Sequence, residues 1–256
     1  MTILCYHAVE PGLGLPLAVA PEAFEGHMAW LSRRRRVLDL EDAAARLDFS
    51  LRLPRGLAAV TFDGGFASVY DHAFPILVRY RVPATVFLVA QTLAPGGREV
   101  DWVDPPLPRP LPTLTLEQVR EMRAAGVRFG SHSYAHRDLT TLSDRECEAD
   151  LRQSRDVLED LLREPIRLLA YPKGRHDERV RAAAARAGFT HSFTERTDPG
   201  ELVGMQAVPR VGVYPGNGLL ALRVKAARWY IPLRTSSIFP VLRRVAMRNS
   251  AAPPMG

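Results

Sequence analysis

The chain has 256 residues and a formal net charge of +6, and arginine supplies nearly all of the positive charge because Lys173 and Lys225 are the only lysines. Hydrophobic residues make up 46% of the sequence and charged residues 24%, the composition of an ordinary globular protein. The length suits one large α/β domain, and no stretch is apolar for long enough to form a transmembrane helix. No basic stripe interleaved with aromatic residues is present, which argues against a nucleic-acid-binding protein.

The cysteines and the beginning of the chain predict a cytoplasmic location. Cys5 and Cys147 lie far apart in the sequence and form no CxxC motif, as expected of inert thiols in a reducing compartment. Met1 is followed almost at once by a strand-like run at residues 3–6, without the charged and apolar regions of a signal peptide. The excess of arginine suits an anionic partner, such as a phosphate group, an anionic glycan or an anionic membrane surface.

Strand-like and helix-like segments alternate along the chain. Buried strands are predicted at residues 3–6, 57–62, 84–90, 127–130, 166–170, 189–194 and 208–213. Helices are predicted at residues 21–35, 41–47, 67–80, 115–125, 143–163, 179–187 and 219–230. Thr115 and Ser143 are expected to cap two of these helices, and Glu146 completes a capping box with Ser143. The alternation predicts a parallel sheet of about seven strands flanked by helices, in one domain over residues 1–230.

Side chains that can do chemistry follow two of the predicted strands. His132 and His136 stand four positions apart, and two neutral imidazoles on one short segment can bind one divalent metal ion. Asp63 ends another strand and is followed by Gly64 and Gly65. Because α/β folds place their sites at the carboxyl ends of parallel strands, the two loops are predicted to meet.

Three further features each allow both a structural and a functional interpretation. His7, at the end of the first strand, either orders the following Pro/Gly-rich loop or belongs to an active site. Trp102, in the long loop at residues 91–112, is either a platform for stacking a sugar or an anchor that pins the loop to the core. The basic tail at residues 231–256 either lies on an anionic membrane surface as a peripheral contact or forms a terminal helix packed on the domain.

Five motifs occur in a specific order: Tyr6-His7, Thr61-Phe62-Asp63, Pro83-Ala84-Thr85-Val86-Phe87, Ser131-His132-Ser133-Tyr134-Ala135-His136 and Tyr171-Pro172-Lys173-Gly174. Together they resemble the motifs of the polysaccharide deacetylases, the NodB-homology carbohydrate esterases. The resemblance is closest to the subgroup that opens with a Tyr-His strand and closes with a Pro-Arg strand, here Pro209-Arg210. It runs from about residue 3 to about residue 230, which is nearly the whole chain.

The resemblance implies a distorted (β/α)7 barrel with its site at the carboxyl ends of the strands. It also implies a metal-dependent hydrolase that removes N- or O-acetyl groups from an acetylated saccharide. In that scheme His132, His136 and an aspartate hold a divalent transition metal ion, with zinc as the first candidate. Asp63 is then the general base for the attacking water, a role that suits a carboxylate near a metal-activated water.

The remaining site residues follow from the same resemblance. His7, His176 and Arg210 are the candidates, in that order, for the proton-donating and base-orienting roles. The expected contacts to the saccharide come from Trp102, Tyr171, Pro172 and Lys173.

Three departures from the family pattern leave the function open between two alternatives. The family sequence Thr-Phe-Asp-Asp-Gly is here Thr61-Phe62-Asp63-Gly64-Gly65, so that Gly64 stands at the position of a metal-binding carboxylate and Asp63 is the acid left to replace it. Lys173 stands where an aromatic wall is usual, and Ala170 where an arginine often steers the base. One alternative is a deacetylase with an altered metal site. The other is a non-catalytic or altered-chemistry relative that binds a glycan or a sugar phosphate in the same cleft.

Overall fold

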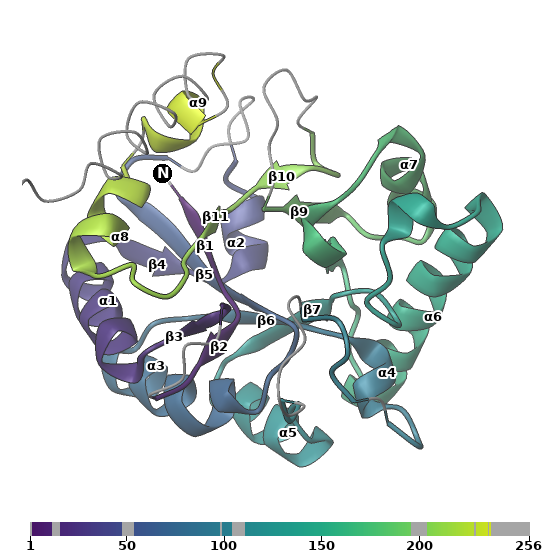
Figure 1. Cartoon of the computed structure of the whole chain (residues 1–256), viewed down its shortest axis with the longest axis horizontal. Helices are drawn as coiled ribbons and strands as arrows, with labels where there is room; N and C mark the ends of the chain where they lie inside the picture. The colour runs from purple at the N-terminus through teal and green to yellow at the C-terminus, as the bar shows by residue number, and fades with distance from the viewer. Residues whose placement is uncertain are drawn as a thin grey trace, which may run out of the picture.

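The structure is a computed structural model that describes residues 2–11, 16–47, 54–97, 99–103, 111–195, 204–227, 229–234 and 236. A parallel sheet curves around the centre of the molecule, and the helices lie around its outside (Figure 1). No helix among the described residues is both long enough and apolar enough to cross a membrane. The predicted basic tail at residues 231–256 lies outside the described residues beyond position 236.

The strands form a nearly closed barrel, as the sequence predicts. Their hydrogen-bonded order is β10-β9-β8-β7-β6-β5-β1-β11, and β4 (Arg36–Leu38) pairs with β5 beside this path. The strands on the path are β1 (Ile3–Tyr6), β5 (Leu57–Asp63), β6 (Thr85–Leu88), β7 (Arg128–Ser131), β8 (Leu168–Ala170), β9 (His191–Thr194), β10 (Val208–Pro209) and β11 (Val211–Gly212). Only Arg210 separates β10 from β11. One short segment therefore pairs with β9 on one side and with β1 on the other, and the sheet returns on itself.

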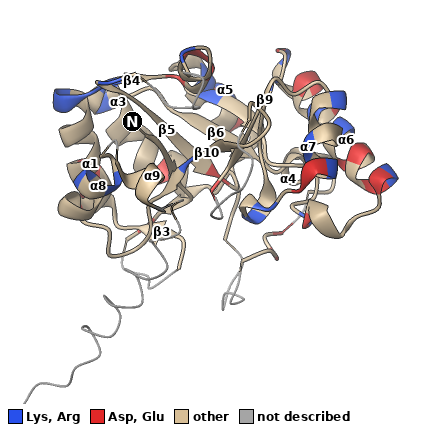
Figure 2. Cartoon of the chain, turned by 90° about the horizontal axis from the view of Figure 1, so that it is seen from above, with Lys and Arg blue, Asp and Glu red and all other residues tan. Residues whose placement is uncertain are grey.

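The helices occupy most of the positions predicted for them. They are α1 (Pro21–Arg34), α2 (Leu40–Ala44), α3 (Phe74–Tyr80), α4 (Ala90–Leu93), α5 (Leu116–Ala124), α6 (Asp144–Leu162), α7 (Glu178–Arg186), α8 (Leu219–Lys225) and α9 (Tyr230–Arg234). Thr115 caps α5 and Ser143 caps α6, and the predicted capping box of Ser143 with Glu146 is confirmed. Acidic and basic residues alternate over α6 and α7 on the outside of the molecule (Figure 2).

Side chains of the central strands alternate between the inside of the barrel and the helical layer. One buried cluster holds Ile3, Ala59, Phe87, Leu168, Ala170 and Phe193, and a second holds Leu4, Tyr6, Val60, Phe62, Val86 and Leu169 with helix residues such as Phe24 and Leu151. In β1 and β5 the odd-numbered residues face inward. The same alternation brings Cys5, Thr61 and Asp63 to the upper part of the barrel interior, where Cys5 and Asp63 are in contact.

The structure differs from the sequence prediction at several places. The Pro/Gly-rich loop after β1 contributes β2 (Ala8–Val9) and β3 (Ala18–Val19), and the arginine run that ends α1 continues into β4 (Arg36–Leu38). The helix predicted at residues 67–80 begins as a π-helical turn at Val69–Ala73 and becomes α3 next to Pro75, which has no N–H to donate to the preceding turn. The strand predicted at residues 208–213 divides at Arg210, because its two halves pair with different neighbours.

Candidate active site

A cavity of about 460 Å³ opens at the carboxyl ends of the barrel strands. Its lining includes Asp63 at the end of β5, His132 and His136 after β7, and His7 after β1. Parallel barrels carry their sites at this end because the loops that follow the strands converge there. The structure therefore brings the residues singled out in the sequence to one cavity.

Asp63 is buried and held by a bidentate ion pair with Arg210. Arg210 Nη1 donates to Asp63 Oδ1 at 2.7 Å, and Nη2 donates to Oδ2 at 2.6 Å. The same Nη1 donates to Thr61 Oγ1 at 3.0 Å. The guanidinium also lies 5.2 Å from the centre of the Phe87 ring. Two parallel hydrogen bonds from Arg210 fix the plane of the Asp63 carboxylate.

The charge state of Asp63 follows from this pairing. Burial alone would raise the pKa of its carboxyl, but the adjacent Arg210 guanidinium and, less strongly, His132 hold the pKa well below its usual range. Burial would likewise lower the pKa of Arg210, but the Asp63 carboxylate raises it above its ordinary value. Both partners are therefore ionised over the whole physiological pH range.

The two histidines lie side by side and are neutral. Their ring centroids are 4.8 Å apart, with the ring planes at 69°. His132 Nδ1 lies 2.8 Å from the carbonyl oxygen of Ala170, which accepts a hydrogen bond from the Nδ1–H tautomer and leaves Nε2 available. Burial lowers the pKa of both histidines, and the neighbouring His132 lowers that of His136 further, well below its usual value.

The loop that carries the histidines is tied to helix α6. Ser131 Oγ lies 2.8 Å from Ser154 Oγ, and the Tyr134 N–H donates to Asp150 Oδ1 at 2.9 Å. Ser133 and His136 adopt left-handed backbone conformations, with φ of 67° and 52°. Such conformations cost energy in non-glycine residues, and the contacts to α6 hold them in place.

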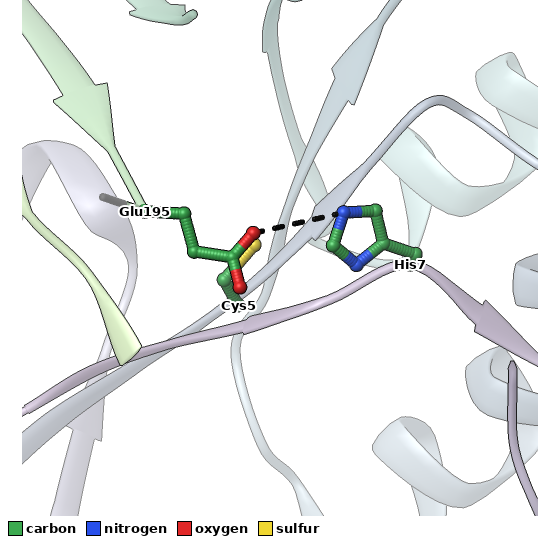
Figure 3. Close-up of side chains that lie close together, drawn as sticks. All are labelled: Cys5, His7 and Glu195. Carbon is green, nitrogen blue, oxygen red and sulfur yellow. Dashed lines mark ion pairs between the residues drawn. The ribbon is translucent and has the colours of Figure 1, made fainter. Parts of the chain in front are cut away.

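A third group of side chains lines the same cavity, and His7 is the one member of this group that the sequence predicted. His7 Nε2 is 3.9 Å from Glu195 Oε2, and Figure 3 shows the two side chains pointing toward each other above Cys5. The Tyr214 hydroxyl donates to Glu195 Oε1, and the Tyr214 ring stacks on His7 with centroids 6.0 Å apart. Glu195 directly follows β9, and this position at the end of a strand was the one feature of the sequence that could have identified it as a site residue.

The residues predicted to contact a saccharide divide into two groups. Trp102 and Lys173 line the cavity, and Trp102 stacks on His136 with ring centroids 4.8 Å apart. Tyr171 and Pro172 do not line it. The Tyr171 side chain is fully buried and its hydroxyl donates to the Gln206 carbonyl oxygen at 2.8 Å, because strand alternation turns it toward the helical layer. His176 also lies off the cavity and contacts Arg181 and Tyr171.

The donor atoms allow a test of whether a metal ion fits. His132 Nε2 is available, and His136 Nδ1 is buried with no hydrogen-bond partner among the described residues, which is the state expected of an atom that awaits a ligand. Asp63 differs because both of its oxygens bind Arg210. Among the described residues, Asp63, His132 and His136 do not bring their ligand atoms within 4.8 Å of one another. The two histidines fit a metal ion, and Asp63 fits the role of a base.

Gly64 has a backbone conformation that suits glycine. Its φ is +95°, and a Cβ atom placed there would lie 2.7 Å from the ring of Phe66, which is 1% exposed. A side chain at this position would be strained by the backbone and crowded by the ring.

Comparisons with known sequences find the family that the motifs resemble. Residues 51–192 match the family model of the polysaccharide deacetylases. The chain is 28% identical to the Bacillus subtilis protein YxkH, whose name assigns it to the polysaccharide deacetylases, over 84% of this chain and 72% of that protein. It is 25% identical to the poly-beta-1,6-N-acetyl-D-glucosamine N-deacetylase of Staphylococcus epidermidis, over 69% of this chain and 61% of that enzyme.

Solved structures show the same fold. The Streptococcus pyogenes deacetylase PplD, in complex with acetate, has a TM-score of 0.73 and 25% identity, covering 89% of this chain and 98% of that one. IcaB from Ammonifex degensii has a TM-score of 0.70 and 27% identity, covering 88% and 95%. With a family model that spans more than half of its residues and a barrel shared over most of its length, this chain belongs to the polysaccharide deacetylase family.

Proposed function

We propose that the protein is a metal-dependent carbohydrate deacetylase that hydrolyses the acetamide of N-acetylglucosamine units in a saccharide. The observation that carries the proposal is an ionised Asp63, held by Arg210 at the edge of a cavity that His132 and His136 also line. The substrate class is supported by the staphylococcal relative, which is an N-deacetylase of poly-beta-1,6-N-acetyl-D-glucosamine.

Asp63 is the base in this scheme. Its carboxylate accepts the proton of the attacking water, and Arg210 keeps the carboxylate in one orientation while it does so. A carboxylate with a lowered pKa is a weak base, so the water it deprotonates must already be acidic. A divalent ion such as zinc, held by His132 and His136, would supply that acidity and would polarise the acyl carbonyl.

The departing amine needs a proton, and His7 is placed to provide it. His7 lines the cavity, and the Glu195 carboxylate lies 3.9 Å from its Nε2. Glu195 is itself oriented by the Tyr214 hydroxyl. Asp63 and His7 thus face one cavity as the acceptor and the donor of a proton, as hydrolysis of an amide requires.

The test uses the purified protein with β-1,6-linked and β-1,4-linked oligomers of N-acetylglucosamine, and measures the acetate and the free amine that are released. We expect release to stop after chelation and to return with zinc. Asp63→Asn is expected to lower the rate by about 10²- to 10⁴-fold. Asp156→Asn, on the exposed side of α6, is the control and should leave the rate unchanged. Binding of the oligomers without release of acetate under any metal condition would favour the non-catalytic alternative.

A further inference from the structure

We propose that Cys5, His7 and Glu195 form a second metal site, in which His7 and Glu195 line the same cavity and the buried Cys5 supplies a thiolate ligand. Their ligand atoms all lie within 4.8 Å of one another, and they are the one group of three or more such residues that meets this condition in the described part of the chain. The group is separate from His132 and His136. It goes beyond the proposed function, which assigns no sulfur ligand.

The spacing of the three side chains fits one ion. His7 Nε2 and Glu195 Oε2 are 3.9 Å apart, which is too long for a hydrogen bond. Two ligands that each lie about 2.0–2.3 Å from a common zinc ion are separated by a distance of this order. Cys5 and His7 stand two positions apart at the end of β1 and face the same side, so the strand itself presents a sulfur and a nitrogen together (Figure 3).

The fold makes room for the third ligand. Glu195 follows β9, which is separated from β1 by the β10–β11 segment, so its side chain must cross that segment to reach His7. It crosses at Gly212, where an added Cβ atom would overlap the Glu195 carboxylate. The absence of a side chain at residue 212 therefore allows the carboxylate to meet Cys5 and His7.

The charges and the type of donor indicate the class of ion. A Cys5 thiolate and the Glu195 carboxylate together carry two negative charges, which balance a divalent cation, while His132 and His136 are both neutral. Binding exchanges the thiol proton of Cys5, now directed at Asp63 Oδ2 at 3.4 Å, for the ion and releases that proton to water. Thiolate, imidazole and carboxylate ligands together select zinc, cobalt or cadmium over magnesium and calcium.

The site has a functional consequence that depends on the proposed function. His7 Nε2 cannot donate a proton to an amine while it binds an ion. Occupancy at His132 and His136 therefore supports hydrolysis, whereas zinc in excess that also fills this second site inhibits it.

The experiment is a titration of the metal-free full chain with cobalt(II), followed by absorption spectroscopy. A thiolate bound to cobalt gives a charge-transfer band in the near ultraviolet, which ligands with only nitrogen and oxygen do not give. We expect this band in the wild-type protein and in the double variant His132→Ala/His136→Ala. We expect it in Cys147→Ser as well, which removes the other buried thiol. It should be lost in Cys5→Ser.

A second variant keeps the test decisive if Cys5→Ser does not fold. Gly212 is not among the residues with positive φ, so Gly212→Ala does not strain the backbone, and its added Cβ displaces the Glu195 carboxylate together with the Tyr214 ring. It should weaken cobalt binding, read from the same band, by about 10-fold or more. A folded wild-type protein without the band overturns the proposal, as does a band that disappears in Cys147→Ser or keeps its full affinity in Gly212→Ala. Acetate release is measured separately, so these outcomes leave the proposed deacetylase activity to its own test.

Discussion

Asp63 and Arg210 illustrate how a buried charge is tolerated at the scale of single residues. Arg210 is 2% exposed and Asp63 is 3% exposed, so each would be costly in the interior without the other. The two hydrogen bonds between them, and the further bond from Arg210 to Thr61, satisfy most of their polar atoms. The pair therefore makes an ionised carboxylate available on a cavity wall.

Removal of the negative charge of Asp63 should destabilise the protein strongly. Asp63→Asn leaves the Arg210 guanidinium buried without an anion, and we expect the free energy of unfolding to fall by about 3–5 kcal/mol in urea denaturation. The control is Glu25→Gln, which breaks the exposed pair with Arg79, whose side chain is 66% exposed. That change should cost less than about 1 kcal/mol. Equal costs for the two variants would show that Arg210 finds another partner.

Substitution of Gly64 by any residue with a side chain should destabilise the protein, and this includes the aspartate that the family pattern suggests. Gly64→Asp and Gly64→Ala are both expected to lower the free energy of unfolding by more than the roughly 1–3 kcal/mol of the positive φ alone, because the added Cβ also meets Phe66. Gly126→Ala isolates the backbone contribution, since Gly126 has φ +97° and no atom within 4 Å of an added Cβ. If zinc raises the melting temperature of Gly64→Asp above that of the wild type, the loop accepts a third ligand and this expectation is wrong.

Helix α6 has a supporting role at the scale of elements. Its buried face carries Asp150 and Ser154, which hold the loop containing His132 and His136. The helix is fixed at its beginning by the capping box of Ser143 with Glu146. An element on the outside of the barrel thus sets the geometry of a loop on the cavity.

A change at Asp150, which does not line the cavity, should weaken zinc binding. Asp150→Ala leaves the Tyr134 N–H without its acceptor, and we expect a loss of about 1–3 kcal/mol in the free energy of unfolding. Zinc affinity, measured by calorimetry with the Cys5→Ser background to remove thiolate binding, should fall by about 10- to 100-fold. Asp156→Ala, on the exposed side of the same helix, should change stability by no more than about 0.5 kcal/mol. Unchanged zinc affinity in Asp150→Ala would mean that the loop holds its shape without α6.

The elements also show what the sequence could and could not predict. Hydrophobic runs and caps located the strands, α5 and α6, because these signals are local. The contact between His7 and Glu195 was not predicted, since it depends on how β9, the β10–β11 segment and β1 pair in space. Tyr171 was expected on the cavity because it belongs to a motif shared with the family. The direction of its side chain depends on the phase of the strand alternation, which only the register with neighbouring strands fixes.

At the scale of the whole molecule, closure of the barrel is what creates the site. The β10–β11 segment pairs with β9 and β1 at once, and Arg210 stands at the point where it changes partners. Its backbone N–H donates to the Thr194 carbonyl oxygen at 2.8 Å, while its side chain reaches Asp63 on β5. The residue at the point where the barrel closes is thus the residue that holds the Asp63 carboxylate in place.

The two cavity histidines should make the stability of the whole chain depend on pH. Burial lowers the pKa of His132 and His136 in the folded protein, whereas in the unfolded chain both titrate near 6.5. Below that pH the unfolded state binds more protons than the folded state, so stability falls as pH decreases, by up to about 1.4 kcal/mol per pH unit for each histidine. The pKa of Asp63 is also lowered, so the stability that its ionised form contributes is lost only in much stronger acid.

The measurement is urea denaturation between pH 7.5 and 5 in the presence of a chelator, for the wild type and for His132→Gln/His136→Gln. His27 and His191 also have lowered pKa values through burial, but both proteins contain them, so the difference between the two slopes isolates the cavity pair. We expect the double variant to have the flatter slope. Added zinc should steepen the wild-type slope further, because the ion binds only neutral imidazole and stabilises the folded state alone. Equal slopes without metal would mean that His132 and His136 are as accessible to protons in the folded barrel as in the unfolded chain.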